Sequence, residues 1–138
     1  MGVDATVRQI LREQLITLVD SPPVAWEGYA FDPTPGTTFF REKLVFQDRR
    51  VDSLGPYCRI VHEGVWMVDV YTPGQKGASV ADNWTDQLIA LFAPGTALEK
   101  SGVTVRIDRA FAGDGISTAE WYMRPCIFDW FTESTNTV

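Results

Sequence analysis

The segment YCRIVHEGVWMVDVYTP, residues 57–73, constrains the fold more than any other part of the chain. Side chains of a strand alternate between two faces, and beyond Gly64 both faces of this segment are mostly apolar. This pattern is typical of a central strand that is covered by a helix on one side and by a partner on the other. Gly64 itself predicts a bulge or a sharp bend. The two faces consist of Trp66, Val68 and Val70 on one side and Val65, Met67, Asp69 and Tyr71 on the other.

The flanking segments supply the other elements of a small α+β fold. Helical periodicity predicts a first helix over 4–19, capped by Asp4, and a second over 79–92 that begins like a capping box. Strand patterns occur over 37–47, 102–111 and 117–131. The predicted order is α-β-β-α-β-β, an antiparallel β-sheet of about four to five strands with two α-helices packed on one face. We expect a single domain over 1–138, with a flexible tail at 132–138.

Two connections have unusual compositions. The segment VAWEGYAFDPTPG, 24–36, carries Trp26, Tyr29 and Phe31 among prolines and glycines that exclude an ordinary helix or central strand. It is either a ligand-binding platform or a connection that its aromatic side chains hold against the sheet edge. Its position between a helix and a strand favours the connection. The polar segment 48–55 predicts a long loop that becomes ordered only against a neighbouring molecule.

The net charge restricts the classes of partner. The formal charge is −6 and the pI is about 4.6, whereas nucleic-acid-binding surfaces carry an excess of Lys and Arg. No apolar run approaches the about 18 residues that a membrane helix needs, so no membrane partner is expected.

Histidine and cysteine are too few and too widely spaced for a recognisable site. Cys58 and His62 share a strand face about 13 Å apart, too far to bind one zinc ion. Cys126 lies on another predicted strand and could approach His62, but no motif of a nucleophilic site accompanies it. Asp69 is a buried hydrogen-bonded carboxylate, a carboxylate that faces a neighbouring subunit, or a catalytic acid. The sequence predicts no enzyme, no metal site and no cofactor.

Three long stretches of the chain resemble one family. They are PVAWEGYAFDPTPGTTFFREKL, then GVWMVDVYTPGQKGASVADNWTDQLIALF, and finally GVTVRI with AEWYMRPCIFDW. In their order and spacing they are similar to the tail terminator (tail completion) proteins of long-tailed bacteriophages. None of them is a catalytic signature.

The resemblance implies a structural virion protein that forms a ring, typically of six copies, and needs no cofactor. Such a ring caps the tail tube, ends tail polymerisation and joins the tail to the head connector or stopper protein. DNA would pass through it without specific binding, and acidic walls would repel the phosphates. The expected locations are the tail–neck region of the virion and, during assembly, the host cytoplasm.

The remaining alternatives are another head–tail joining protein, such as a neck or stopper component, or a small-ligand-binding module or enzyme. The last two predict a concave site that holds Asp69 or His62. A ring needs surface patches for its neighbours, and surplus aromatic residues and exposed charges are the candidates. The candidate subunit or tube interface consists of Trp26, Tyr29, Arg49, Arg50, Asp69, Tyr71 and Trp121.

Overall fold

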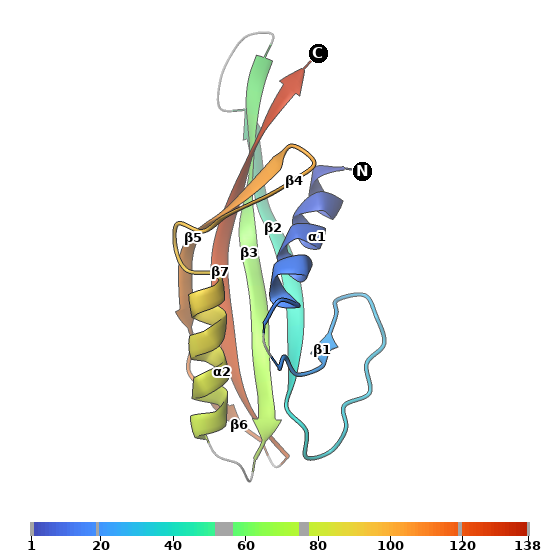
Figure 1. The fold of residues 1–138 in the computed structure, drawn as a ribbon, viewed down its shortest axis with the longest axis vertical. Helices are drawn as coiled ribbons and strands as arrows, with labels where there is room; N and C mark the ends of the chain where they lie inside the picture. Colours follow the sequence, from blue (N-terminus) through green and yellow to red (C-terminus); the bar gives the residue numbers. More distant parts are fainter. Residues whose placement is uncertain (1, 19, 52–56, 75–77, 119, 138) are drawn as a thin grey trace.

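The computed structural model describes residues 2–18, 20–51, 57–74, 78–118 and 120–137, which form two helices and a seven-stranded sheet (Figure 1). The strand order across the sheet is β1-β2-β3-β7-β5-β4, and β6 pairs with β7 beside this path. The elements are α1 (Val3–Leu15), β1 (Val24–Ala25), β2 (Phe39–Val51), β3 (Tyr57–Pro73), α2 (Ala78–Leu91), β4 (Ala97–Lys100), β5 (Val103–Ala112), β6 (Ile116–Ser117) and β7 (Trp121–Thr137).

The predicted fold class was wrong. The chain is mostly β, and its sheet is curled and mixed rather than antiparallel with four to five strands, because β1 runs parallel to β2. Two of the missed strands, β1 and β6, have only two residues each, too few for a periodic signal. The third, β4, forms a hairpin with β5 through Ser101 and Gly102, whose φ angles are 53° and 79°. Positive φ at both positions is the geometry of a tight hairpin turn, so this Ser-Gly pair marked a strand boundary.

The core lies between the helices and one face of the sheet. The apolar stripe of α1 (Val7, Ile10, Leu11, Leu15) and the buried residues of α2 and its end (Ala81, Leu88, Phe92) pack against it. On the sheet, this face is formed by even-numbered residues of β3 and β7, including Trp66, Phe128 and Trp130. The helices therefore bury one of the two apolar faces of β3, as the alternation in β3 requires.

The opposite side of the sheet, which we call the open face, carries no helix. It includes odd-numbered residues of β3 and β7 such as Met67, Asp69 and Ile127, and these three side chains are partly exposed. Their partners on the outer strands include Lys43 and Phe111. A mainly apolar, half-exposed sheet face is unusual for a surface that meets only water.

Gly64 lies in a row of paired residues that crosses β2, β3, β7 and β5 through Phe46, Gly64, Trp130 and Ile107. A Cβ atom at Gly64 would stand 2.0 Å from the carbonyl oxygen of Val45 and 2.9 Å from the Trp130 ring. The expected irregularity occurs at this level, but in the neighbouring strands: the register shifts in β2 between Phe46 and Asp48, and in β5 between Ile107 and Arg109. The two bulges bend the sheet on both sides of the continuous β3–β7 pair.

Several element boundaries differ from the predicted ones. Helix α1 ends at Leu15 instead of continuing to 19, and its N-cap is Gly2, with Asp4 in the first turn. Residues 48–51, expected to begin a long loop, extend β2 and pair with 60–63 of β3; residues 52–56 lie outside the described part. β7 continues to Thr137, so strand pairing includes 132–137. Among the described residues no helix is long and apolar enough to cross a membrane.

Candidate functional site

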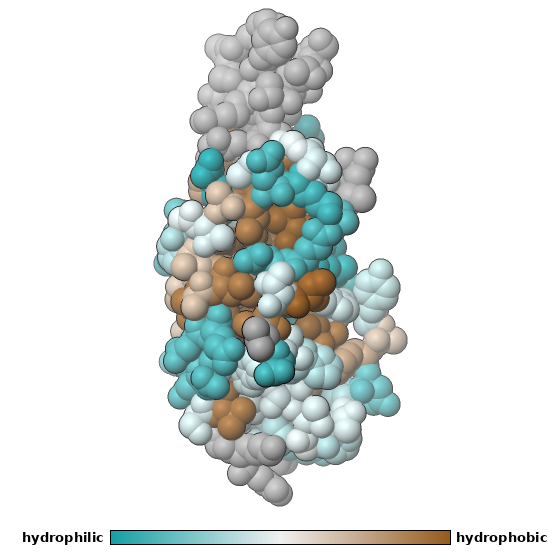
Figure 2. Space-filling view, viewed as in Figure 1, coloured by the Kyte–Doolittle hydropathy of each residue, from teal (hydrophilic) through white to brown (hydrophobic). Residues whose placement is uncertain are grey.

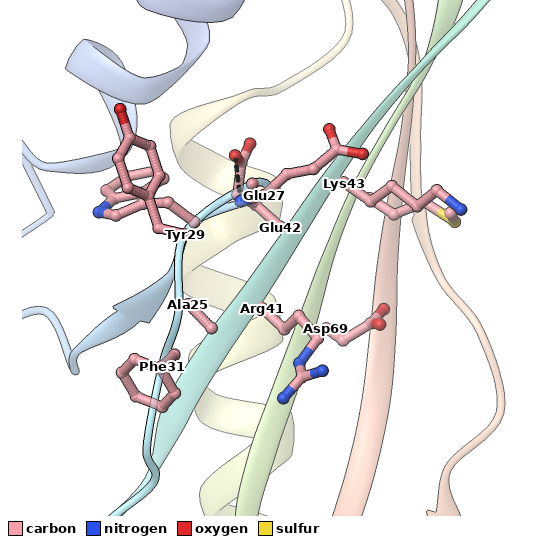
Figure 3. Close-up of a pocket in the computed structure, with 11 residues that line it drawn as sticks. Ala25, Glu27, Tyr29, Phe31, Arg41, Glu42, Lys43 and Asp69 are labelled. Carbon is pink, nitrogen blue, oxygen red and sulfur yellow. Dashed lines mark hydrogen bonds between the residues drawn. The ribbon is translucent and has the colours of Figure 1, made fainter.

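A groove lies beside β2, and we call it the Arg41 groove (Figure 3). It lies between the connection that follows β1 and the strands β2 and β3, and it has a volume of about 330 Å³. Tyr29 and Phe31 lie on one side of β2 and Lys43 and Asp69 on the other, so the groove wraps around the strand edge. Its lining comprises Ala25, Trp26, Glu27, Gly28, Tyr29, Phe31, Arg41, Glu42, Lys43, Met67 and Asp69.

Arg12 of α1 fixes the connection that forms one wall. Its Nη2 donates to the carbonyl oxygen of Glu27 at 3.1 Å, and its guanidinium lies 5.2 Å from the ring centre of Trp26 and 5.9 Å from that of Tyr29. Cation–π contacts of this kind hold aromatic rings over a charged group. Arg12 therefore holds the connection that carries Trp26 and Tyr29 against α1, even though Tyr29 is 71% exposed.

Glu42 accepts from three elements at once. Its Oε1 accepts from Arg12 Nε at 2.9 Å and from the backbone N–H of Glu27 at 3.1 Å, and its Oε2 accepts from Trp66 Nε1 at 2.7 Å. The carboxylate is 2% exposed, and a buried charge is stable only when it is paired and hydrogen-bonded in this way. The cluster joins α1, the connection and the β2–β3 pair into one rigid unit.

A second carboxylate, Glu27, closes the same wall. Its Oε1 accepts from Arg8 Nη1 at 2.6 Å and from the backbone N–H of Leu44 at 3.2 Å. Burial acts to raise the pKa of Glu27, but these two hydrogen bonds outweigh burial and lower it. The contact with Leu44 also occupies an edge N–H of β2, which would otherwise face solvent.

Positive charge faces outward on the other wall. Arg41 and Lys43 are exposed, and neither makes a hydrogen bond or ion pair with another described residue. Asp69, opposite Arg41 on β3, is half-buried; burial raises its pKa, and the charge of Arg41 partly opposes this. The groove thus combines apolar walls with two exposed cations that form no ion pair with another described residue.

Aromatic side chains continue the site along the open face. Phe39 stacks on Tyr71 with ring centres 4.7 Å apart, and Trp121 meets Phe39 edge-on at 5.1 Å. Phe31 of the connection contacts Phe39 at 5.2 Å, and Arg41 lies 5.7 Å from the Tyr71 ring. Burial raises the pKa of the Tyr71 hydroxyl, and the charge of Asp69 raises it further.

Five of the seven candidate interface residues are close together in this region. Trp26, Tyr29 and Asp69 line the groove, and Tyr71 and Trp121 belong to the adjoining aromatic cluster. Arg49 lies outside this region, because it is eight residues beyond Arg41 on β2, about 26 Å away. Arg50 is further along the same strand, and its side chain lies outside the described part.

The sequence reasoning missed Arg12, Glu42, Arg41 and Lys43. Glu42 had a readable signal, because it alternates with Phe40 and Leu44 and must share their buried face. A carboxylate at such a position needs a cation, and Arg12 meets this need from a helix 30 residues away in sequence. Nothing in the local pattern identifies Arg12 as that partner.

A second hollow lies between α1 and the same connection. It is lined by Ala5, Arg8, Gln9, Arg12, Glu13, Ile16, Trp26 and Tyr29. Figure 2 shows hydrophobic surface in the middle of this side of the molecule, with hydrophilic surface around it. Ile16 is 63% exposed here, whereas Arg8 and Arg12 are already paired with Glu27 and Glu42.

The alternatives that involve His62 and Cys126 receive no support from geometry. His62 pairs with Thr132 across β3 and β7, and Cys126 pairs with Val68, six residues along β3 and about 20 Å away. Burial lowers the pKa of His62, against the opposing charge of Asp4 3.7 Å away. Burial also raises the pKa of Cys126 to about 12, so its thiol is a poor nucleophile. No group of three potential metal ligands occurs in the described residues.

Comparison with known proteins identifies a family and solved structures with a similar fold. The family model described as "Phage tail terminator protein" matches residues 6–130. A solved structure of a protein known only by a sequence identifier has a TM-score of 0.69 and 20% identity. The alignment covers 94% of this chain and 92% of that chain. At this identity it establishes a shared fold only. No curated protein sequence matches the chain.

Proposed function

Because this chain belongs to the phage tail terminator family, we propose that it forms a ring that caps the tail tube, ends tube polymerisation and joins the tail to the head connector. The protein is a structural component of the phage tail and thus of the virion. The family match over residues 6–130 is the observation that carries the proposal, since it includes nearly every element of the fold.

The surface supports a role in assembly. The open face is half-exposed and largely apolar, and the Arg41 groove and the aromatic cluster adjoin it. Interfaces between subunits combine buried aromatic anchors with a charged rim, and this region has both. A ring further requires two different patches on each subunit, one for each neighbour.

The acidity of the chain is compatible with DNA transit through the ring. With a formal charge of −6, lumen-facing carboxylates would repel phosphates within the about 8 Å over which charges act at physiological salt. If so, replacing lumen-facing acids by Lys should slow DNA ejection, and unchanged ejection kinetics would contradict this part of the proposal.

The runner-up is another head–tail joining protein, a neck or stopper component, and the two differ in their partner. A terminator binds the tail tube and limits its length, whereas a stopper binds the connector alone. Electron microscopy of the purified protein, alone and mixed with tail tubes, separates them. Rings and tubes with capped ends are the expected result, and the capped ends are the observation that distinguishes a terminator from a stopper. Protein that neither forms rings nor caps tubes at any concentration contradicts the proposal.

A further inference from the structure

A short hairpin strand, β6, lies beside β7, across the sheet from the strand β2 that carries the Arg41 groove. The hairpin that includes β6 spans 113–118, between β5 and β7. Ile116, in β6, is 54% exposed, and the side chains of Asp114, before β6, and Glu120, after it, are exposed as well. This segment therefore presents one exposed aliphatic side chain and two carboxylates to a partner.

The hairpin is held rigidly. Arg124 Nε donates to the carbonyl oxygen of Gly113 at 3.1 Å, and the backbone N–H of Thr118 donates to the carbonyl oxygen of Trp121 at 2.8 Å. Gly115 lies so close to the Tyr122 hydroxyl that an added Cβ atom would be 1.9 Å from it. A segment that is already fixed loses little conformational entropy when it binds.

The Arg41 groove has the complementary chemistry. Its two exposed cations, Arg41 and Lys43, outnumber the half-buried acid Asp69 on the same side, so this side carries a net positive charge. Glu27 and Glu42 are already paired with Arg8 and Arg12. The apolar lining, which includes Tyr29, Phe31 and Met67, would receive an aliphatic side chain. The Arg41 groove thus offers two exposed cations and an apolar lining to an acidic segment that carries an aliphatic side chain.

The two surfaces lie at the same height along the strands. Strand pairing places Phe39, Tyr71, Met123 and Ile116 in one row across β2, β3, β7 and β6. In the next row Arg41 and Asp69 pair with Pro125, whose carbonyl oxygen accepts from the N–H of Gly113. The patches are therefore separated across the sheet, by three strand spacings or about 14 Å, and not along it. A contact between two different patches, repeated from copy to copy, closes into a ring when the rotation between copies closes, and otherwise forms a helix.

We infer that the Asp114–Ile116 hairpin of one subunit docks in the Arg41 groove of the next copy of this chain, with Ile116 in the apolar lining and Asp114 and Glu120 facing Arg41 and Lys43. This inference rests on the proposed function, because it specifies the contact that builds the ring. The hollow beside α1 is a poorer receptor for an acidic hairpin, since its two arginines are already paired with Glu27 and Glu42.

A charge-swap experiment tests the contact. Lys43→Glu and Asp114→Lys each place like charges together, so each should raise the concentration needed for half-association by at least about tenfold, as followed by sedimentation velocity. The double variant Lys43→Glu/Asp114→Lys restores opposite charges at every contact and should return to within about threefold of the wild-type value. Ile16→Ser, on the α1 hollow, is the matched control and should change association by less than about twofold. A double variant that associates as weakly as the single variants overturns the inference.

Disulfide trapping tests the same contact on tail tubes, in a Cys58→Ser background. The pair Lys43→Cys/Asp114→Cys should give a covalent ladder on oxidation, while the pair Ile16→Cys/Asp114→Cys gives none. Within one subunit the distance across the sheet exceeds the about 4.4–6.8 Å between Cα atoms that a disulfide spans, so bridges must join different copies. Capped tubes without a ladder overturn this inference and leave the proposed function standing. Loss of tube binding by Lys43→Glu with unchanged self-association assigns the groove to the tube protein and also overturns it. Failure of the wild-type protein to cap tubes contradicts the proposed function itself.

Discussion

The indole Nε1 of Trp66 donates a 2.7 Å hydrogen bond to Oε2 of Glu42, and both side chains are almost completely buried. The bond connects the central strand β3 to the edge strand β2 beneath α1. Through Glu42 it also reaches Arg12, which holds Trp26 and Tyr29. The position of the exposed aromatic segment therefore depends on a carboxylate in the core.

The first prediction concerns this carboxylate. Arg12→Met should destabilise the protein by about 3 kcal/mol, because it leaves Glu42 buried without a cation. Arg12→Met/Glu42→Gln should recover a substantial part of this loss, because the amide that replaces the carboxylate is neutral and its oxygen can still accept a hydrogen bond from Trp66 or from the N–H of Glu27. Urea denaturation of the wild type, both single variants and the double variant gives the coupling energy. Strictly additive effects would show that the pair does not interact.

The second prediction concerns the row through Gly64. Gly64→Ala should cost at least about 3 kcal/mol, because the new Cβ atom meets the backbone carbonyl of Val45, which cannot rotate away as a side chain can. Gly74→Ala is the matched control, since its Cβ atom would make only ordinary contacts, 3.5 Å or more from Glu120. Thermal denaturation of both variants is sufficient. Equal melting temperatures for the two would be inconsistent with this close packing.

The third prediction concerns the pH dependence that Asp69 contributes. Burial raises its pKa in the folded protein, so the folded state binds a proton more readily than the unfolded chain. Stability from this group is then greatest below the ordinary pKa of an Asp, and it decreases as the pH rises through the higher folded-state value. Asp69→Asn should remove this decrease, so its stability relative to the wild type should grow between about pH 4 and pH 7.

The control for Asp69→Asn is Asp86→Asn, which removes one exposed carboxylate of α2 and so tests the effect of net charge alone. Denaturant midpoints measured across the pH range compare the three proteins. If the advantage of Asp69→Asn over the wild type is the same at both ends of the range, burial does not perturb the carboxyl group.

The fourth prediction concerns Cys126. Its side chain is fully buried and burial raises its pKa to about 12, so at pH 8 roughly one thiol in ten thousand is ionised. In a Cys58→Ser variant, iodoacetamide should label the native protein at least about a thousandfold more slowly than the urea-unfolded protein. Mass spectrometry of quenched samples gives both rates. Rapid native labelling would mean that the β3–β7 region opens readily.

The sequence allowed more of the elements to be predicted than of their arrangement. The alternation in 57–73 located a central strand with one face for helices and one without them, and the helical stripes located α1 and α2. The number of strands was underestimated because β1 and β6 exist only through pairing with long neighbours, which no local pattern expresses. Residues 48–51 have a polar composition typical of a loop, yet they extend β2 because β3 offers a continuous ladder.

The candidate site was predictable in part for a similar reason. Aromatic residues in a connection rich in proline and glycine attract attention by their type, so Trp26 and Tyr29 were identified, and Trp121 was identified as a surplus aromatic residue on the last predicted strand. Arg41 and Lys43 did not stand out, because exposed cations on a strand are common. Their significance depends on the groove, which forms only when the connection folds back across β2. Site residues that are ordinary in sequence and special only in position escape single-sequence reasoning.

The uninterrupted pairing of β3 with β7 has a mechanical consequence. The two bulges bend the sheet at the level of Gly64, but they lie in β2 and β5, while the β3–β7 ladder passes through that level without a break. The 17 residues of β3 make a rod about 55 Å long, stiffened by its partner over the whole length. A force applied at one end of this strand pair would tilt the whole subunit, because the β3–β7 pairing has no irregularity at which the pair could bend. A displacement imposed at one end of the subunit would thus move the far end in the same concerted step.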